Sequence, residues 1–64
     1  MKNNVKIARI KVSMKQDELA KVTGVTRQTI GLIEKGDYNP SLNLCIALAK
    51  ALDKTLDELF WEVE

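Results

Sequence analysis

The feature that most restricts the fold of this chain is the stretch 16–34, QDELAKVTGVTRQTIGLIE, in which two short helical patterns flank a glycine. Small and apolar residues recur along it at helical spacing: Leu19, Ala20, Thr23, Val25, Ile30 and Ile33. Gly24 falls where the first helix must end, and a residue without a Cβ accepts a positive φ there without strain. Thr26 offers a hydroxyl as the N-cap of the second helix. The stretch therefore predicts two helices meeting at a tight corner, with Ala20 small enough to let them approach.

The outer side of the second predicted helix has the groups that DNA bases require. A period of 3.6 turns its isoleucines inward and leaves four residues outside: Arg27, Gln28, Gly31 and Leu32. Arginine forms two hydrogen bonds with guanine, glutamine forms two with adenine, and leucine suits a thymine methyl group. Gly31 permits close approach to DNA or is merely tolerated, and Leu32 has packing against the following loop as its alternative. The pattern predicts a helix-turn-helix motif with its second helix in the major groove.

Length and composition limit the class of protein. The 64 residues predict one domain, and a chain of this size buries only about 60% of its unfolded surface, so its core is small. No apolar run approaches the roughly 20 residues that span a bilayer, and no signal-peptide pattern begins the chain, so we expect a cytoplasmic protein without a membrane partner. One cysteine and no histidine argue against a disulfide framework and against a zinc site. With no glycine-rich phosphate loop and no base for Cys45, which we expect in the core, the sequence predicts neither an enzyme nor a cofactor.

The charges of the chain are unevenly distributed. Residues 1–35 hold eight cations and three anions, whereas residues 36–64 hold two cations and six anions. This polarity suits a protein whose N-terminal half faces phosphates. Short chains also divide unevenly by chance, so the asymmetry supports a nucleic-acid partner without establishing one.

Nearly the whole chain, from about residue 5 to residue 60, resembles the phage repressor and Cro type of DNA-binding domain. The most specific pieces are QDELA at 16–20, TRQTI at 26–30, IE at 33–34, NPS at 39–41 and DELF at 57–60. The chain is similar above all to small stand-alone, xenobiotic-response-element-like regulators of that family, which have no ligand domain. The resemblance implies an all-α fold of five helices and a sequence-specific transcriptional regulator, most simply a repressor that binds double-stranded DNA as a homodimer.

The resemblance also implies roles for individual residues. Arg9 pairs with Glu34 across the interior of the domain, the alternative being an Arg9 that points at solvent or phosphate. Thr23 departs from the family, which usually has an aliphatic residue there, but its hydroxyl can bond back to the preceding turn. Contacts with the DNA backbone are expected from the start of the first corner helix, from the turn and second helix, and from the loop that follows: Gln16, Thr26, Thr29, Lys35, Tyr38 and Asn39.

Three more helical patterns lie outside the corner. Asn3 or Asn4 can cap a first helix that ends at about residue 11 or 12, with an inner side predicted from spacing: Val5, Ala8 and Val12. Ser41 can cap a fourth helix, with an apolar stripe that follows helical spacing: Leu42, Cys45, Leu48, Ala49 and Leu52. Thr55-x-x-Glu58 is typical of a capping box and opens a short fifth helix whose apolar residues help to close the core.

After Trp61 the tail alternates apolar and acidic residues, which is the period of a strand. Trp61 and Val63 must pack locally, pair with residues 1–3 in a short sheet, or meet a second subunit. Similarity to small dimeric repressors favours a symmetric dimer through the fifth helix and tail, with recognition helices about 34 Å apart. The predicted interface consists of five residues: Leu56, Leu59, Phe60, Trp61 and Val63.

Two other functions remain open at this stage. An antitoxin-type protein would use the same domain for DNA while its tail holds a regulatory protein partner, as the predicted exposure of Trp61 and the acidic C-terminal half allow. A small helical interaction module would have no DNA function, and the basic N-terminal half would be incidental.

Overall fold

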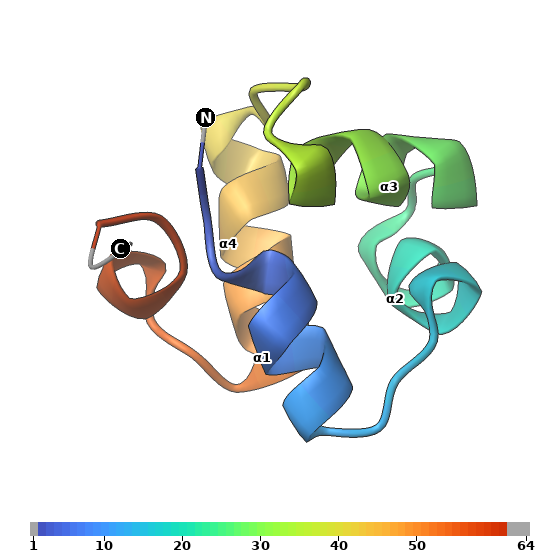
Figure 1. Ribbon diagram of the computed structural model, residues 1–64, viewed down its shortest axis with the longest axis horizontal. Coiled ribbons are helices and arrows are strands. Elements are labelled where there is room, and N and C mark those ends of the chain that lie inside the picture. Colours follow the sequence, from blue (N-terminus) through green and yellow to red (C-terminus); the bar gives the residue numbers. More distant parts are fainter. Residues whose placement is uncertain (1, 62–64) are drawn as a thin grey trace.

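The computed structural model describes residues 2–61, which form four α-helices and one short π-helical segment (Figure 1). These are α1 (Val5–Lys11), α2 (Gln16–Thr23), α3 (Arg27–Lys35), α4 (Leu42–Leu52) and η1 (Asp57–Trp61). The predicted all-α, five-helix fold is confirmed. The described residues contain no strand, and Trp61 ends η1 instead of opening one, while Val63 lies outside the described residues. No helix within residues 2–61 has the length and apolar character needed to cross a membrane.

Every helix contributes to one small core. In Figure 1, α1 lies in front of α4, with η1 on one side and the α2–α3 corner on the other. The buried apolar side chains come from all five elements: Val5, Ala8, Leu19, Ala20, Ile30, Ile33, Leu48, Ala49, Leu52 and Leu59. This arrangement holds the corner rigidly on a base formed by α1 and α4 while leaving the outer side of α3 uncovered.

The corner forms as its local sequence predicts. Gly24 ends α2 with φ +77°, and the Thr26 hydroxyl accepts a hydrogen bond from the Thr29 N–H at 3.1 Å. The Thr23 hydroxyl donates to the Leu19 carbonyl at 2.7 Å, so its polar group is satisfied within the preceding turn. These contacts fix the point at which the chain reverses and α3 begins.

The later helix starts are also capped as predicted. The Ser41 hydroxyl accepts from the Leu44 N–H at 3.2 Å at the start of α4. At the start of η1, the Thr55 N–H donates to the Glu58 carboxylate at 2.9 Å and the Glu58 N–H donates to the Thr55 hydroxyl at 3.1 Å. Both bonds of the capping box are therefore present.

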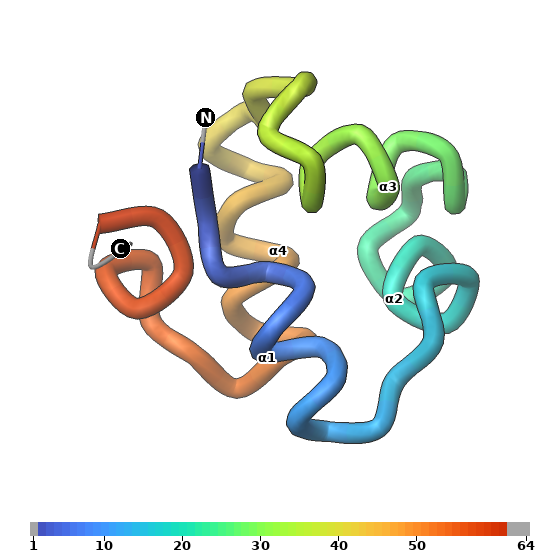
Figure 2. Tube along the Cα trace, viewed as in Figure 1, coloured from blue at the N-terminus to red at the C-terminus, as the bar shows by residue number. Residues whose placement is uncertain are grey.

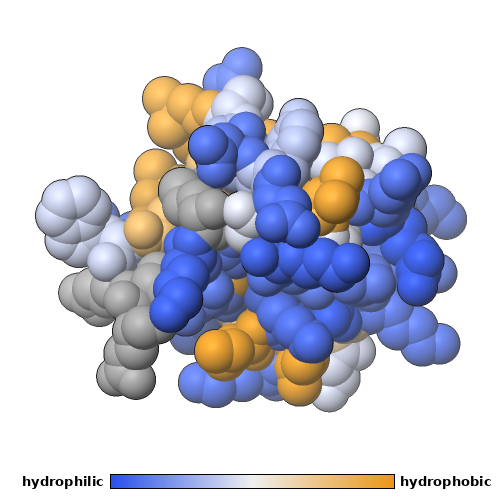
Figure 3. All heavy atoms as spheres, turned by 45° about the horizontal axis from the view of Figure 1, so that its top comes forward, coloured by the Kyte–Doolittle hydropathy of each residue, from blue (hydrophilic) through white to orange (hydrophobic). Residues whose placement is uncertain are grey.

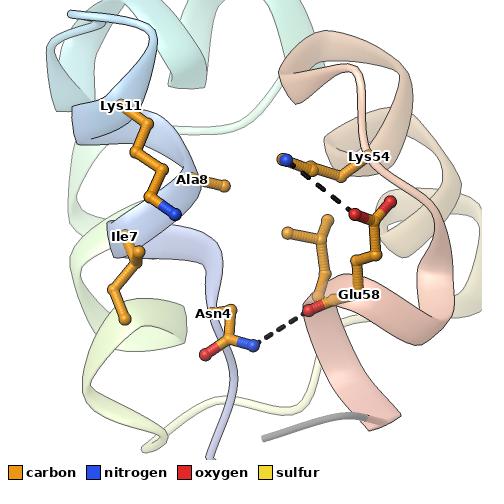
Figure 4. A pocket seen from close by; sticks show the side chains of 7 residues that line it. Asn4, Ile7, Ala8, Lys11, Lys54 and Glu58 are labelled. Atoms are coloured by element: carbon orange, nitrogen blue, oxygen red, sulfur yellow. Dashed lines mark hydrogen bonds and ion pairs between the residues drawn. The ribbon is translucent and has the colours of Figure 1, made fainter.

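The N-terminal segment is attached to η1. Figure 2 shows the first described residues passing beside η1 before α1 begins. The Asn4 N–H donates to the Leu59 carbonyl at 2.8 Å, and its side-chain amide donates to the Glu58 carbonyl at 2.9 Å (Figure 4). Asn4 thus precedes α1, but its side chain bonds to η1, and of the two predicted capping residues it is Asn3 whose side chain accepts from the Val5 N–H, at 3.1 Å. The two ends of the described chain meet through these bonds and not through a sheet.

Two predictions about the core are wrong, and one is only partly right. Val12 is exposed because α1 ends at residue 11, so the helical period no longer directs its side chain inward. Leu42 is 67% exposed because it lies in the first turn of α4, before the helix reaches the core, and Leu44 packs against the core instead. Cys45 is partly buried, and this burial raises the pKa of its thiol, which keeps it in the unreactive protonated form.

Candidate nucleic-acid interface

The outer side of α3 is open to solvent. Ile30 and Ile33 are fully buried, whereas Arg27 and Gln28 are exposed in the first turn of the helix and Leu32 is exposed one turn later. The predicted division of the helix into inward and outward residues is confirmed. In Figure 3, hydrophilic side chains cover most of the half of the view that contains α2 and α3.

A shallow groove runs beside this outer side of α3. It has a volume of about 410 Å³ and is lined by side chains from α1, α2 and α3: Lys6, Gln16, Arg27, Gln28, Gly31, Leu32, Glu34 and Lys35. All four predicted base-contacting residues therefore lie together, and the predicted backbone contacts Gln16 and Lys35 lie beside them. Gly31 leaves room in the groove, since outside its own stretch of α3 the nearest heavy atom to an added Cβ, the Gln16 side-chain nitrogen, would be 3.9 Å away.

Among residues 2–61, Glu34 is the only acidic residue that lines the groove, and neighbouring side chains neutralise its charge. Its carboxylate accepts hydrogen bonds from Arg9 Nε at 2.7 Å, Arg9 Nη2 at 3.3 Å and Gln16 Nε2 at 2.9 Å. Arg9 Nη1 also donates to the Met14 carbonyl at 2.7 Å. The exposed fraction is 11% for the Arg9 side chain and 4% for that of Glu34, so the pair is nearly buried and the predicted ion pair is confirmed. Positive charge consequently dominates the solvent-facing part of the groove.

The remaining predicted backbone contacts lie outside the groove. Thr26 and Thr29 are joined by a hydrogen bond between their hydroxyls at 3.0 Å at the start of α3. Tyr38 and Asn39 are exposed in the loop between α3 and α4. They occupy the flanks of α3, where a DNA backbone would pass if the helix entered a major groove.

The residues predicted for the dimer interface divide into two groups. Trp61 is 82% exposed and Leu56, five residues before it, is also exposed, whereas Phe60 is partly buried. Leu59 has no exposed surface, so it belongs to the core of the protomer and is unavailable for direct contact with a second chain. Val63 lies outside the described residues.

The sequence predictions gave no surface role to some of the residues that the structure exposes. Lys6 lines the groove beside α3, and its only sequence signal is its position three residues before Arg9, on the same side of α1. Leu42 and Ile46 expose apolar surface on α4. Among residues 2–61 no group of three His, Cys, Asp or Glu side chains is arranged to hold a metal ion.

The fold and the groove beside α3 define a class of protein, a helix-turn-helix DNA-binding domain. The chain belongs to the helix-turn-helix family, whose model matches residues 5–59. YgzD of Bacillus subtilis (strain 168), an uncharacterised transcriptional regulator of the helix-turn-helix type, is 46% identical over 61 residues, which are 95% of this chain and 92% of YgzD.

Two solved structures are similar to most of the chain. The restriction-modification controller protein C.AhdI from Aeromonas hydrophila has a TM-score of 0.83 and 35% identity, with 89% of this chain and 86% of that chain covered. The P22 c2 repressor, solved in complex with a synthetic operator, has a TM-score of 0.81 and 30% identity, with 84% and 82% covered. The resemblance to phage repressors is confirmed.

Proposed function

We propose that this chain is a homodimeric transcriptional repressor that binds an inverted-repeat operator, with α3 of each protomer in the major groove. The observation that carries the proposal is the groove beside α3, which brings planar hydrogen-bonding groups and positive charge together on an otherwise open surface. Similarity to a repressor solved with its operator and to a controller protein supports the same function.

Base contacts are assigned to the exposed part of α3. The Arg27 guanidinium suits a guanine and the Gln28 amide an adenine, because each offers two hydrogen bonds in one plane. Leu32 supplies an apolar contact for a thymine methyl group, and Gly31 lets the helix backbone come close to the base edges. These residues determine which sequence is bound.

Backbone contacts hold the domain in position without reading sequence. Gln16 has a second amide N–H for a phosphate, since Glu34 accepts from the other. Further phosphate contacts come from the start of α3 and from the end of α3 with its following loop: Thr26, Thr29, Lys35, Tyr38 and Asn39.

Dimerisation is assigned to the apolar surface of η1 and α4. Leu56 and Trp61 on or beside η1 are exposed, as are Leu42 and Ile46 on α4, and isolated exposure of this much apolar surface is costly in a small domain. Figure 3 shows one group of apolar atoms at the upper left, on the side of the molecule that contains α4 and η1, with smaller groups elsewhere in the view. A two-fold axis on that side would leave both α3 helices free to contact one face of the DNA.

A dimer bound across a promoter would exclude polymerase from it, and control would come from the protein's concentration or from a regulatory protein partner. Its site of action would be the cytoplasm. No catalytic step is part of this function.

Selection of bound duplexes from a random DNA pool tests the proposal. We expect an inverted repeat whose half-site centres lie about 10 base pairs, or 34 Å, apart. Enrichment of no sequence, with salt-sensitive binding to all duplexes alike, would contradict sequence-specific regulation and favour a simple interaction module. Co-purification with a second polypeptide at fixed stoichiometry would favour the antitoxin-type function instead.

Sedimentation equilibrium tests the dimer surface separately. Trp61→Ala should shift the chain toward monomer, whereas Val22→Ala, which truncates another exposed apolar side chain on α2, should leave the association unchanged. Equal association of the two variants would place the interface elsewhere.

A further inference from the structure

One cation beside α3 has no role in the contacts assigned above. Lys6 is exposed on α1 and lines the same groove as Arg27, Gln28 and Lys35. It is the only residue of α1 that lines this groove.

Two side-chain contacts determine where Lys6 lies. Before α1, the Asn3 side-chain amide donates to the Ile33 carbonyl at 2.8 Å, and within α1 the Arg9 guanidinium binds Glu34. Both contacts join α1 and the segment before it to the C-terminal half of α3. Lys6 lies between Asn3 and Arg9 and is three residues from each, so it faces the same half of α3.

The charges around Lys6 favour an anion. In the described part of the chain, the cations that line the groove are Lys6, Arg27 and Lys35. The one acidic lining residue there, Glu34, accepts hydrogen bonds from Arg9 and Gln16 through its carboxylate. A lysine ammonium is a compact charge that binds phosphate without the planar geometry needed to distinguish bases. The DNA backbone passes on both flanks of a helix in the major groove, so a phosphate is the anion that this position would meet.

We propose that Lys6 is a DNA-positioning residue that binds a backbone phosphate together with Lys35, so that α1 as well as the helix-turn-helix corner contacts the operator. This inference rests on the proposed function. It extends the DNA-binding surface to a helix that the sequence patterns did not include in it.

The matched control is Lys11 on the same helix. Lys11 is also exposed, but it points into a different groove, between α1 and η1, which is lined as well by Asn4, Lys54 and Glu58 (Figure 4). Lys6→Gln and Lys11→Gln each remove one positive charge from the same helix. A difference in DNA binding between them therefore reports a direct phosphate contact and not the change in net charge of the protein.

The experiment measures the dependence of binding on salt for the duplex enriched in the random-pool selection. Each lost phosphate contact should reduce the steepness of the plot of log affinity against log salt concentration by about 0.9, or about 1.8 for two protomers. We expect this change for Lys6→Gln, the wild-type slope for Lys11→Gln, and recovery of the slope for Lys6→Arg. All three variants should keep the wild-type thermal midpoint, because both lysines are exposed.

The outcomes separate the two proposals. If the wild-type chain binds the duplex and Lys6→Gln has the wild-type slope, or if Lys11→Gln flattens the slope equally, Lys6 makes no direct contact and the inference fails while the proposed function stands. If the wild-type chain enriches and binds no duplex, both fail.

Discussion

Among the residues that line the groove beside α3, Glu34 is the one whose replacement by alanine should lower the stability of the fold most. The substitution removes the acceptor of three hydrogen bonds, two from Arg9 and one from Gln16, and leaves a nearly buried guanidinium without its counter-charge. Arginine cannot lose its proton in a protein, so the charge remains.

The expected cost is about 3 kcal/mol. Breaking a buried ion pair by removing one partner costs about 3–5 kcal/mol, and the lower end applies because Arg9 keeps its bond to the Met14 carbonyl. A domain of this size is stable by roughly 3–10 kcal/mol, so the loss is a large part of the total. With a urea m value of about 1 kcal/mol/M, the unfolding midpoint should fall by about 3 M.

Arg9→Leu should be milder than Glu34→Ala. The leucine restores apolar packing, and the Glu34 carboxylate keeps its hydrogen bond from Gln16. Combining Arg9→Leu with Glu34→Ala should cost less than the sum of the two single changes, because neither charge is then left unpaired. The coupling energy from this double-mutant cycle should be at least about 2 kcal/mol.

Urea unfolding followed by far-ultraviolet circular dichroism measures all four proteins at one protein concentration. Lys54→Ala is the control, since it breaks the exposed Lys54–Glu58 pair at 3.8 Å and should lower the unfolding midpoint much less than Glu34→Ala does. Equal midpoints for Glu34→Ala and the wild-type chain, or additive single changes, would refute the argument that the pair fixes α1 against α3.

Three further predictions concern α3, the helix ends and acid stability. In mobility-shift assays, Arg27→Ala should weaken operator binding by roughly 1–3 kcal/mol and relax preference at one base position, whereas Lys35→Ala should weaken binding evenly across sequences; unaltered preference for Arg27→Ala would contradict the assignment. In thermal melts, Gly24→Ala should destabilise the domain by about 1–2 kcal/mol because alanine is strained at a φ of +77°, although nothing lies within 4 Å of the added Cβ. Gly31→Ala should stabilise the domain by up to about 1 kcal/mol, because alanine has the higher helix propensity. A Gly24→Ala variant more stable than Gly31→Ala would be evidence against both predictions. Hydrogen bonds from Thr55, first from its backbone N–H and then from its side chain, lower the pKa of Glu58. The ionised Glu58 carboxylate therefore contributes its full stabilisation above the ordinary glutamate pKa, and this contribution is lost as the pH falls through the lower pKa of the folded state. Glu58→Gln should therefore unfold more easily than the wild-type chain at neutral pH, and the difference should disappear as the pH falls below the lowered pKa of Glu58.

The features that sequence predicted well are those decided within a few residues of the chain. Gly24, Thr26, Ser41 and the Thr55 capping box each act on a group no more than four positions away, so their chemistry is independent of how the helices pack. The Arg9–Glu34 pair spans 25 residues and was predictable only because the chain resembles a family that has such a pair.

The features that sequence missed depend on the packing of distant segments. Nothing local distinguishes Leu59, which is buried, from Leu56, which is exposed, because the fifth helix is too short to establish a periodic apolar side. The bonds from Asn4 to η1 and the position of Lys6 beside α3 both follow from the placement of α1, which a helical period does not determine. The roles of individual residues in DNA binding stay predictions.

The attachment of α1 to α3 has a consequence for the spacing of half-sites. The Asn3 side chain donates to the Ile33 carbonyl and Arg9 binds the Glu34 carboxylate. Because of these bonds, α3 cannot tilt without moving α1 and the rest of the protomer. One inserted base pair between half-sites rotates one of them by about 35° around the duplex axis. A recognition helix fixed in this way cannot turn to follow the rotated half-site. The dimer interface would have to bend, or the duplex would have to twist. An operator lengthened or shortened by a single base pair should therefore be bound as poorly as one with a wrong base.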